Sequence, residues 1–148
     1  GSGDGQFDTP RGVTLAPDGR VYVADTNNNR IQQFTQDGVF VRKWDYYLSG
    51  DEYPFQPESV AVGSDGSVYV ADINNCRIVK FTADGAFLIK WDVYLFSDGG
   101  KRYYPNSVAV GPDGLIYVAC RGEVTYDPPD NRIRRADPAG PGTGCRPR

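Results

Sequence analysis

The sequence contains no histidine and no methionine. Without histidine, the chain lacks the commonest general base, the commonest zinc ligand and the side chain that usually titrates near neutral pH. The missing initiator methionine indicates a processed chain or an excerpt of a longer protein. No apolar run approaches the ~20 residues of a membrane span, and no N-terminal segment resembles a signal peptide. We therefore expect no insertion into a membrane.

Cysteine is also scarce. The three cysteines, Cys76, Cys120 and Cys145, form no CxxC pair, which excludes zinc ribbons and c-type haem attachment. We expect no metal site and no cofactor. The net charge of −3 disfavours a nucleic-acid partner, because a phosphate backbone attracts basic surfaces. With 39% hydrophobic residues and no low-complexity tract, residues 1–148 predict a single folded domain.

The sequence contains three copies of one segment. They begin at Pro10, Pro57 and Pro105, at spacings of 47 and 48 residues. The first copy reads PRGVTLAPDGRVYVADTNNNRIQQF, and the second reads PESVAVGSDGSVYVADINNCRIVKF. The third begins PNSVAVGPDGLIYVAC and is interrupted before NRI resumes at residue 131. Repeats of about 40–50 residues with several strand signals each predict propeller blades.

The first two copies have the full pattern of four antiparallel strands, and the third has the beginning of it. An Asp-Gly pair follows the first apolar run at Asp18, Asp65 and Asp113, and such a pair favours a hairpin. A second apolar run, an Asn-rich turn, a third run, another Asp-Gly pair and a fourth run follow. The predicted fold class is all-β, with four-stranded antiparallel β-propeller blades that pack between their neighbours. We place these blades at residues 10–44, 57–91 and 105–137, with the third incomplete and residues 138–148 as a tail.

Three blades form an incomplete ring, because closed propellers typically have about four to eight. The third copy has no counterpart of the fourth run of the second copy, residues 86–91. An unpaired strand edge and two open blade faces would invite pairing. Three solutions stay open: the chain is an excerpt of a longer propeller, two copies close a six-bladed ring, or copies stack head to tail into a filament.

The repeated segment resembles the NHL repeat. The resemblance rests on VYVADTNNNRI and VYVADINNCRI, each followed by an Asp-Gly turn and a strand that ends in Trp44 or Trp91. It covers the first two copies almost fully and the third in part. The resemblance implies a β-propeller, often six-bladed, that mainly binds proteins or RNA in animals. In bacteria such propellers are frequent modules of secreted or surface proteins, which leads us to expect an extracellular or cell-surface location.

Enzymatic activity is not expected from the sequence. The peptidyl amidating lyases that resemble this family rely on histidine-bound metal, which this chain cannot provide. A calcium-dependent lactonase-like propeller would need convergent carboxylates and amides near its central channel. The residues at the three blade entrances, Arg11, Glu58 and Asn106, do not form such a set. We therefore predict a non-catalytic module for binding or assembly.

The length variation between copies falls on one face of the predicted propeller, which carries the inter-blade links (residues 45–57 and 92–105) and the interruption at 120–131. We call it the link face. These segments are rich in tyrosine, which is a favoured contact residue in binding surfaces. They also carry more acidic than basic residues, which disfavours RNA as a partner. The link face is therefore predicted to bind a protein, other ligands or a second copy. The alternative is that the aromatic residues extend strands or cover the core. The candidate contact residues are Tyr46, Tyr47, Tyr53, Phe55, Tyr94, Phe96, Tyr103, Tyr104 and Tyr126.

Two further features recur in the turns. One aspartate and one arginine appear in each of the first two copies, and they predict a structural ion pair that caps the turn: Asp25 with Arg30, and Asp72 with Arg77. Cys76 and Cys120 lie on the same face of neighbouring blades, so a disulfide between them is one prediction. A bond between Cys120 and Cys145 is the alternative, because the sequence does not define the geometry.

Overall fold

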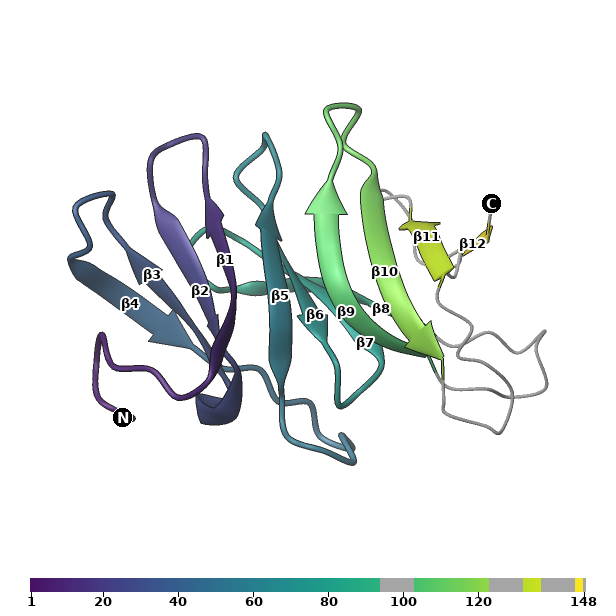
Figure 1. Ribbon diagram of the computed structural model, residues 1–148, viewed down its shortest axis with the longest axis horizontal. Coiled ribbons are helices and arrows are strands. Elements are labelled where there is room, and N and C mark those ends of the chain that lie inside the picture. Colours follow the sequence, from purple (N-terminus) through teal and green to yellow (C-terminus); the bar gives the residue numbers. More distant parts are fainter. Residues whose placement is uncertain (94–102, 123–131, 137–145, 148) are drawn as a thin grey trace.

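The computed structural model describes residues 1–93, 103–122, 132–136 and 146–147 (Figure 1). These residues form three antiparallel sheets of four strands each. The first sheet contains β1 (Pro10–Leu15), β2 (Val21–Asp25), β3 (Arg30–Phe34) and β4 (Phe40–Trp44), with a short 3-10 turn at Thr26–Asn28. The second contains β5 (Pro57–Val62), β6 (Val68–Asp72), β7 (Arg77–Phe81) and β8 (Phe87–Asp92). The third contains β9 (Tyr103–Val110), β10 (Ile116–Gly122), β11 (Arg132–Ala136) and β12 (Arg146–Pro147).

The three sheets stand side by side in chain order (Figure 1). The first strands of the sheets are neighbours, since β5 contacts both β1 and β9. Successive sheets therefore pack face against face around a common inner edge, as consecutive propeller blades do. The predicted all-β fold of propeller blades is confirmed.

The first Asp-Gly pair of each copy forms the turn at the same end of its sheet, at the top of Figure 1. Each glycine lies in the left-handed region, with φ of 84° at Gly19, 79° at Gly66 and 77° at Gly114. The preceding aspartate accepts a hydrogen bond from the backbone N–H two residues later, as Asp65 does from Ser67 at 3.0 Å. An Asp-Gly pair supplies both requirements, which is why these turns could be read from the sequence.

The core consists of two apolar clusters, one in each contact between sheets. The middle sheet contributes to both clusters, and its strand β6 is buried at every residue. Strand β1 of the first sheet has only one packed face and alternates between exposed and half-buried residues. Val13 and Leu15 on its outer face are 69% and 61% exposed. The apolar second strand is thus buried on both faces in the blade that has a neighbour on each side.

The third sheet has a fourth strand that the sequence did not reveal. Residues 146 and 147 form β12, which pairs with β11 through Arg134 opposite Pro147 and Arg135 opposite Arg146. The prediction that the third copy stops after three strands is therefore corrected. The expected signal was an apolar run directly after an Asp-Gly turn, whereas β12 is only two residues long and comes from the end of the predicted tail. In the part of the chain that the structure describes, no helix is long and apolar enough to cross a membrane.

Candidate functional site at the link face

The link face is organised around one Asp–Arg pair in each of the first two blades. Asp25 ends β2 and lies opposite Arg30, the first residue of β3, so that the strand register itself brings them together. Arg30 Nε donates to Asp25 Oδ2 at 2.8 Å. Asp72 and Arg77 repeat the arrangement with the same atoms at the same distance. Both aspartates are fully buried, so these pairs lie inside the structure and not at its surface.

The aspartate of each pair also fixes the chain that enters the blade. Asp25 accepts a hydrogen bond from the backbone N–H of Asp8 at 2.8 Å, and Asp72 accepts one from Gln56 at 3.0 Å. Residues 1–8 thus occupy the same place beside the first blade as the link does beside the second. Each of these two segments also packs one aromatic ring on its blade. Phe7 packs on Phe34 of the first blade, and Phe55 packs on Phe81 of the second.

The second partner of the arginine differs between the two blades. Arg30 donates to the backbone carbonyls of Ser2, Gly3 and Gln6 at 2.8–2.9 Å. Arg77 instead donates from Nη1 and Nη2 to both carboxylate oxygens of Asp51, at 2.7 and 2.9 Å. The guanidinium of Arg77 also lies 5.0 Å from the centre of the Tyr46 ring. Asp51 therefore fastens the middle of the 45–57 link to the blade through a bidentate, charge-assisted contact.

Asp51 was not singled out as a functional residue in the sequence, although it lies in a link whose acidity was noted. Its hydrogen bonds with Arg77 hold the pKa of the Asp51 carboxyl below its usual value. A carboxyl with a lowered folded-state pKa stabilises the fold fully above its unfolded pKa, and the contribution disappears as the pH falls through the lowered value. The link is thus held most firmly at neutral pH.

Three of the nine candidate aromatic residues belong to the core. The exposed fractions are 7% for Tyr46, 3% for Phe55 and 1% for Tyr103. Tyr46 packs edge-on against Phe55 and Phe81 and stacks on Phe87 at 4.8 Å. Their assignment to an exposed contact face is therefore corrected. Tyr46 and Phe55 belong to one of the apolar clusters between sheets, and Tyr103, the first residue of β9, belongs to the other. This is the alternative that the sequence left open.

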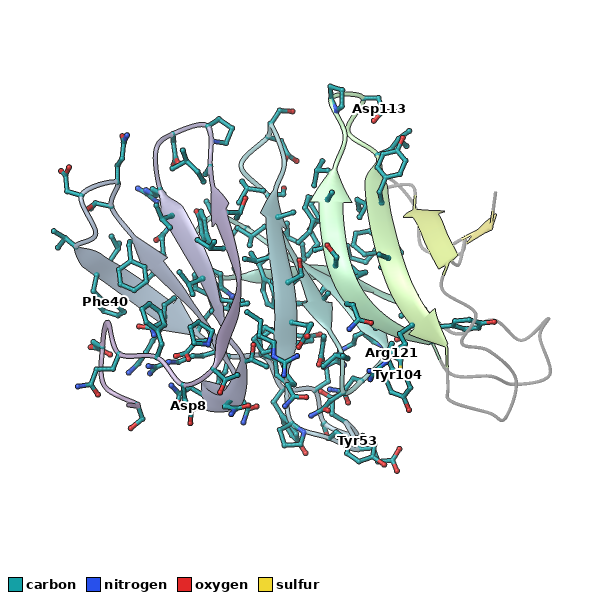
Figure 2. The ribbon with its side chains drawn as sticks, in the orientation of Figure 1. Asp8, Phe40, Tyr53, Tyr104, Asp113 and Arg121 are labelled. Carbon is teal, nitrogen blue, oxygen red and sulfur yellow. The ribbon has the colours of Figure 1, made fainter. Side chains whose placement is uncertain are left out.

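Two of the candidates are well exposed and one is half-buried. Tyr47 is 68% exposed, Tyr53 is 41% exposed, and Tyr104 is half-buried. Figure 2 shows Tyr53 at the lower end of the molecule, on the same end as Asp8 and Tyr104. The remaining candidates, Tyr94, Phe96 and Tyr126, lie outside the described residues.

A polar cleft of about 230 Å³ lies beside Tyr53. The backbone of Tyr53 is held in place because Asn75 Nδ2 donates to its carbonyl at 3.2 Å. Its hydroxyl donates to Glu52 Oε1 at 3.0 Å. The charged side chains around the cleft are Asp51, Glu52, Arg77, Lys90 and Asp92.

The charges around the cleft leave an excess of acid. Both cations are already paired, Arg77 with Asp51 and Lys90 with Asp92 at 2.9 Å. In the described ranges, no group of three or more carboxylate or cysteine side chains is arranged to hold a metal ion. The cleft therefore offers carboxylate oxygens and a tyrosine ring to a ligand. Glu58, at the entrance of the second blade, is paired with Arg11 at 2.6 Å.

The two described cysteines are both buried in the cluster between the second and third sheets. Within the described residues, no disulfide joins Cys76 to Cys120. The predicted bond is therefore absent from this structure. Cys76 Sγ donates a hydrogen bond to the Ile73 carbonyl at 3.9 Å. Cys145 lies outside the described residues.

Comparison with known proteins agrees with the arrangement of the sheets as propeller blades. The model of the NHL repeat matches residues 7–34 and 56–81. Protein lin-41 of Caenorhabditis elegans is 51% identical over 43 residues, which are 29% of this chain and 4% of that protein. NHL repeat-containing protein 3 of Mus musculus is 46% identical over 46 residues, which are 30% of this chain and 13% of that protein. The chain thus spans a small part of the length of these relatives.

Solved structures share the fold at low sequence identity. The Kuenenia stuttgartiensis hydrazine synthase covers 90% of this chain with a TM-score of 0.68 and 18% identity, over 34% of its own chain. A catalytically inactive virginiamycin B lyase from Staphylococcus aureus, solved with quinupristin, covers 89% with a TM-score of 0.58 and 20% identity, over 42% of its own chain. The fold is that of a partial β-propeller. The matches to the NHL repeat cover the first three strands of each of the first two blades.

These neighbours overturn one prediction. The expectation that the chain is not an enzyme is wrong, because the structures that share its fold include a lyase and a synthase. The absence of histidine excludes only sites that depend on that side chain. A propeller is a scaffold that carries different sites on its loops, so its fold does not exclude catalysis. Identities of 18% and 20% show the fold alone and assign no reaction to this chain.

Proposed function

We propose that this chain is a protein-interaction module whose link face binds a basic segment of a partner protein. NHL repeats generally act in protein interactions, and the matched repeats lie in the first two blades. The observation that carries the proposal is the exposed ring of Tyr53 beside a cleft that has more carboxylates than cations. Tyrosine and acid together suit an arginine or lysine side chain, which stacks on the ring and pairs with the carboxylate.

The contacts of the link support this role because they hold the site in one shape. Asp51 is bound by Arg77 through two hydrogen bonds, and its Oδ2 accepts the backbone N–H of Leu48 at 2.8 Å. Asn75 holds the carbonyl of Tyr53 from the other side. A loop that is ordered before binding loses less conformational entropy when the partner arrives. The link can therefore present Tyr53 and Glu52 without a large ordering cost.

A binding assay with matched peptides tests this proposal. We expect a short fluorescein-labelled arginine-rich peptide to bind the chain, and a glutamate-rich peptide of equal length to bind at least about tenfold more weakly. Tyr53→Ala should weaken binding of the basic peptide about tenfold, and Glu52→Gln about threefold. Fluorescence anisotropy at two salt concentrations measures both effects, and added salt should weaken the wild-type complex.

The matched control is Tyr117→Ala. Tyr117 is also a partly exposed tyrosine, 37% exposed, but it lies on β10 outside the link face. Its replacement should leave the affinity unchanged. Equal affinity for the two peptides, or an equal loss in the two tyrosine variants, would contradict a site at Tyr53.

A second candidate function is self-assembly through the outer faces of the first and third sheets. It is favoured by a comparison of residues on the two outer faces with the residues at the same positions of the buried second sheet. Val13 and Leu15 are the counterparts of Val60 and Val62, which pack against the first sheet inside the chain. On the third sheet, Tyr117 is the counterpart of Tyr69, which is 2% exposed.

The two outer faces thus carry the residue types that meet in the internal contacts between sheets. A second copy could place its third sheet on the first sheet of its neighbour. This contact is heterologous, so it either closes a ring of two copies or continues as a filament.

Light scattering tests assembly directly. The 148-residue chain of 16.3 kDa should give at least twice that mass at micromolar concentration. Leu15→Glu should return it to a monomer, because a charge would be buried in the contact. Leu88→Glu is the control, since Leu88 is 48% exposed but lies on the edge strand β8. A monomer at every concentration for the wild-type chain would rule this candidate out.

A further inference from the structure

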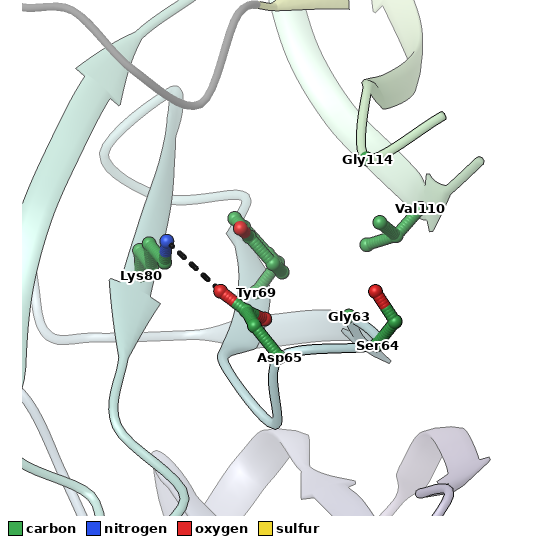
Figure 3. A pocket seen from close by; sticks show the side chains of 7 residues that line it. All are labelled: Gly63, Ser64, Asp65, Tyr69, Lys80, Val110 and Gly114. Atoms are coloured by element: carbon green, nitrogen blue, oxygen red, sulfur yellow. Dashed lines mark ion pairs between the residues drawn. The ribbon is translucent and has the colours of Figure 1, made fainter. Parts of the chain in front are cut away.

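A cavity of about 310 Å³ lies between the second and third sheets, at the end opposite the link face (Figure 3). The Asp-Gly turn between β5 and β6 contributes Ser64 and Asp65, and β9 contributes Val110. The remaining lining residues are Tyr69 from β6, Lys80 from β7, Gly63 and Gly114. Binding sites for small molecules usually measure about 300–1,000 Å³, so this cavity suits a ligand at the small end of that range.

Lys80 is the unusual member of this cavity. Its side chain is only 15% exposed, and its ammonium lies 3.7 Å from Asp65 Oδ2, beyond hydrogen-bond distance. The ammonium also lies 5.2 Å from the centre of the Tyr69 ring. Within the described ranges, Lys80 Nζ makes no hydrogen bond. An ammonium carries three N–H donors, and a charge withdrawn from water is costly unless those donors find acceptors.

The first blade shows how the repeat fills the same place without a lysine. Gln33 takes the position of Lys80 beside Tyr22, the counterpart of Tyr69. Gln33 Nε2 donates to Tyr22 Oη at 2.7 Å and to the Ala83 carbonyl at 3.2 Å. The Tyr22 hydroxyl reaches the same carbonyl at 3.3 Å. Neutral hydrogen bonds thus occupy this corner between the first and second sheets. Among the described residues of the second and third sheets, an ammonium faces the cavity instead.

Asp65 provides a fixed negative charge on the same side of the cavity as Lys80. The Ser67 N–H donates to its Oδ1 at 3.0 Å, and the Ser67 hydroxyl donates to its Oδ2 at 2.8 Å. Partial burial acts to raise the pKa of Asp65, but these hydrogen bonds and the charge of Lys80 outweigh it and lower the pKa. The carboxylate therefore stays ionised at neutral pH. Figure 3 shows Asp65 and Lys80 on one side and Val110 across from them.

We propose that this cavity binds a small zwitterion of the amino-acid type. The ligand carboxylate accepts hydrogen bonds from Lys80, its ammonium pairs with Asp65, and its apolar side chain lies against Val110. A ligand with a single charge would be attracted by one of the two fixed charges and repelled by the other. A zwitterion matches both, and it supplies the acceptors that the Lys80 ammonium lacks within the described residues.

An NMR titration of the 148-residue chain with L-leucine tests the proposal. We expect saturable shifts of the backbone amide signals of Ser64 and Gly114, and none at Tyr53 on the link face. N-acetyl-L-leucine lacks the ammonium, and L-leucinamide lacks the carboxylate. Each should bind about tenfold more weakly than leucine, because each loses one charge-assisted contact.

Lys80→Gln is the informative variant, because the first blade already places glutamine beside the equivalent tyrosine and the fold should therefore persist. It should weaken leucine binding about tenfold or more, as should Asp65→Asn. Lys90→Gln, a lysine replacement at the link face, should leave binding unchanged. The proposal is overturned if leucine causes no saturable shift at the cavity, if Lys80→Gln binds like the wild-type chain, or if the two derivatives bind as well as leucine. The peptide assay at the link face is independent of each of these outcomes.

Discussion

Replacement of Arg77 by methionine should lower the free energy of unfolding by about 3–5 kcal/mol, because it leaves a buried carboxylate without its cation. Arg77 is 2% exposed and is hydrogen-bonded to both Asp72 and Asp51. Methionine retains most of the side-chain volume but none of the donors. Asp72 is fully buried and would keep only its hydrogen bonds from Gln56 and Asn75. Asp51 would lose the contact that holds the link.

The control for this prediction is Arg42→Met. Arg42 Nη1 lies 2.8 Å from Asp84 Oδ1, but the two side chains are 39% and 68% exposed. Exposed pairs contribute about 0–1 kcal/mol, so this variant should be close to the wild-type chain. Urea unfolding followed by tryptophan fluorescence measures both. Similar losses in the two variants would show that burial of the pair is not what makes Arg77 important.

A second variant keeps the test usable if Arg77→Met does not fold, since domains of this size have only about 5–15 kcal/mol of stability. Arg77→Lys retains the charge but loses the fork that binds two carboxylates at once. We expect an intermediate loss of about 1–3 kcal/mol. The 45–57 link should then become more sensitive to limited proteolysis, because Asp51 is held by fewer hydrogen bonds.

The blades could be predicted because their signals are local. The Asp-Gly turns, the apolar second strand and the Asp-x-x-x-x-Arg spacing each depend on residues that are close in the chain. Antiparallel pairing of β2 with β3 and of β6 with β7 then places Asp25 opposite Arg30 and Asp72 opposite Arg77. No tertiary information was needed to bring these side chains together.

The link face was harder to predict because its residues are buried by distant contacts. Tyr46 and Phe55 lie in a link that looks like a solvated loop, yet both pack against Phe81 in the middle of the second sheet. One signal was available, since Phe7 and Phe55 both lie shortly before the first proline of a copy. A repeated aromatic residue in a loop is better explained by a repeated packing site than by a binding surface.

The two charged partners that sequence reasoning missed illustrate the same limit. Asp51 binds Arg77 across 26 residues, and at the first blade backbone carbonyls take its place. Nothing in the composition of a link separates an acid that faces solvent from one that binds a buried arginine. Lys80 replaces Gln33 of the first copy, but only the structure shows that a cavity accompanies the exchange.

Replacement of Gly85 by alanine should be the most costly change in the second Asp-Gly turns. Gly85 has φ of 87°, where a side chain costs about 1–2 kcal/mol. A Cβ atom there would lie 2.6 Å from Cδ2 of Trp44, on the neighbouring blade. Trp44 is held between Tyr22 and Phe81, each with a ring centre 6.1 Å away. The ring has little room to retreat, so overpacking should add about 1–3 kcal/mol.

Gly38 provides a matched control within the same chain. It is the counterpart of Gly85 in the first blade, and its φ of 82° is nearly the same. A Cβ atom at Gly38 would meet nothing within 4 Å. Gly38→Ala should therefore lower the free energy of unfolding only by the cost of a left-handed backbone, about 1–2 kcal/mol. The difference between the two variants then measures the contact of the Gly85→Ala side chain with Trp44. Equal losses of unfolding free energy in urea titrations would contradict that contact.

A cycle with Trp44→Leu separates the two contributions to the cost at Gly85. In that background the cost of Gly85→Ala should fall towards the cost of Gly38→Ala, because the smaller side chain leaves space for the Cβ atom. The strain of the left-handed backbone is unchanged by this substitution, so it remains in both backgrounds. The coupling energy then measures how tightly the first and second blades are packed. That packing decides whether the three sheets unfold as one cooperative unit or separately.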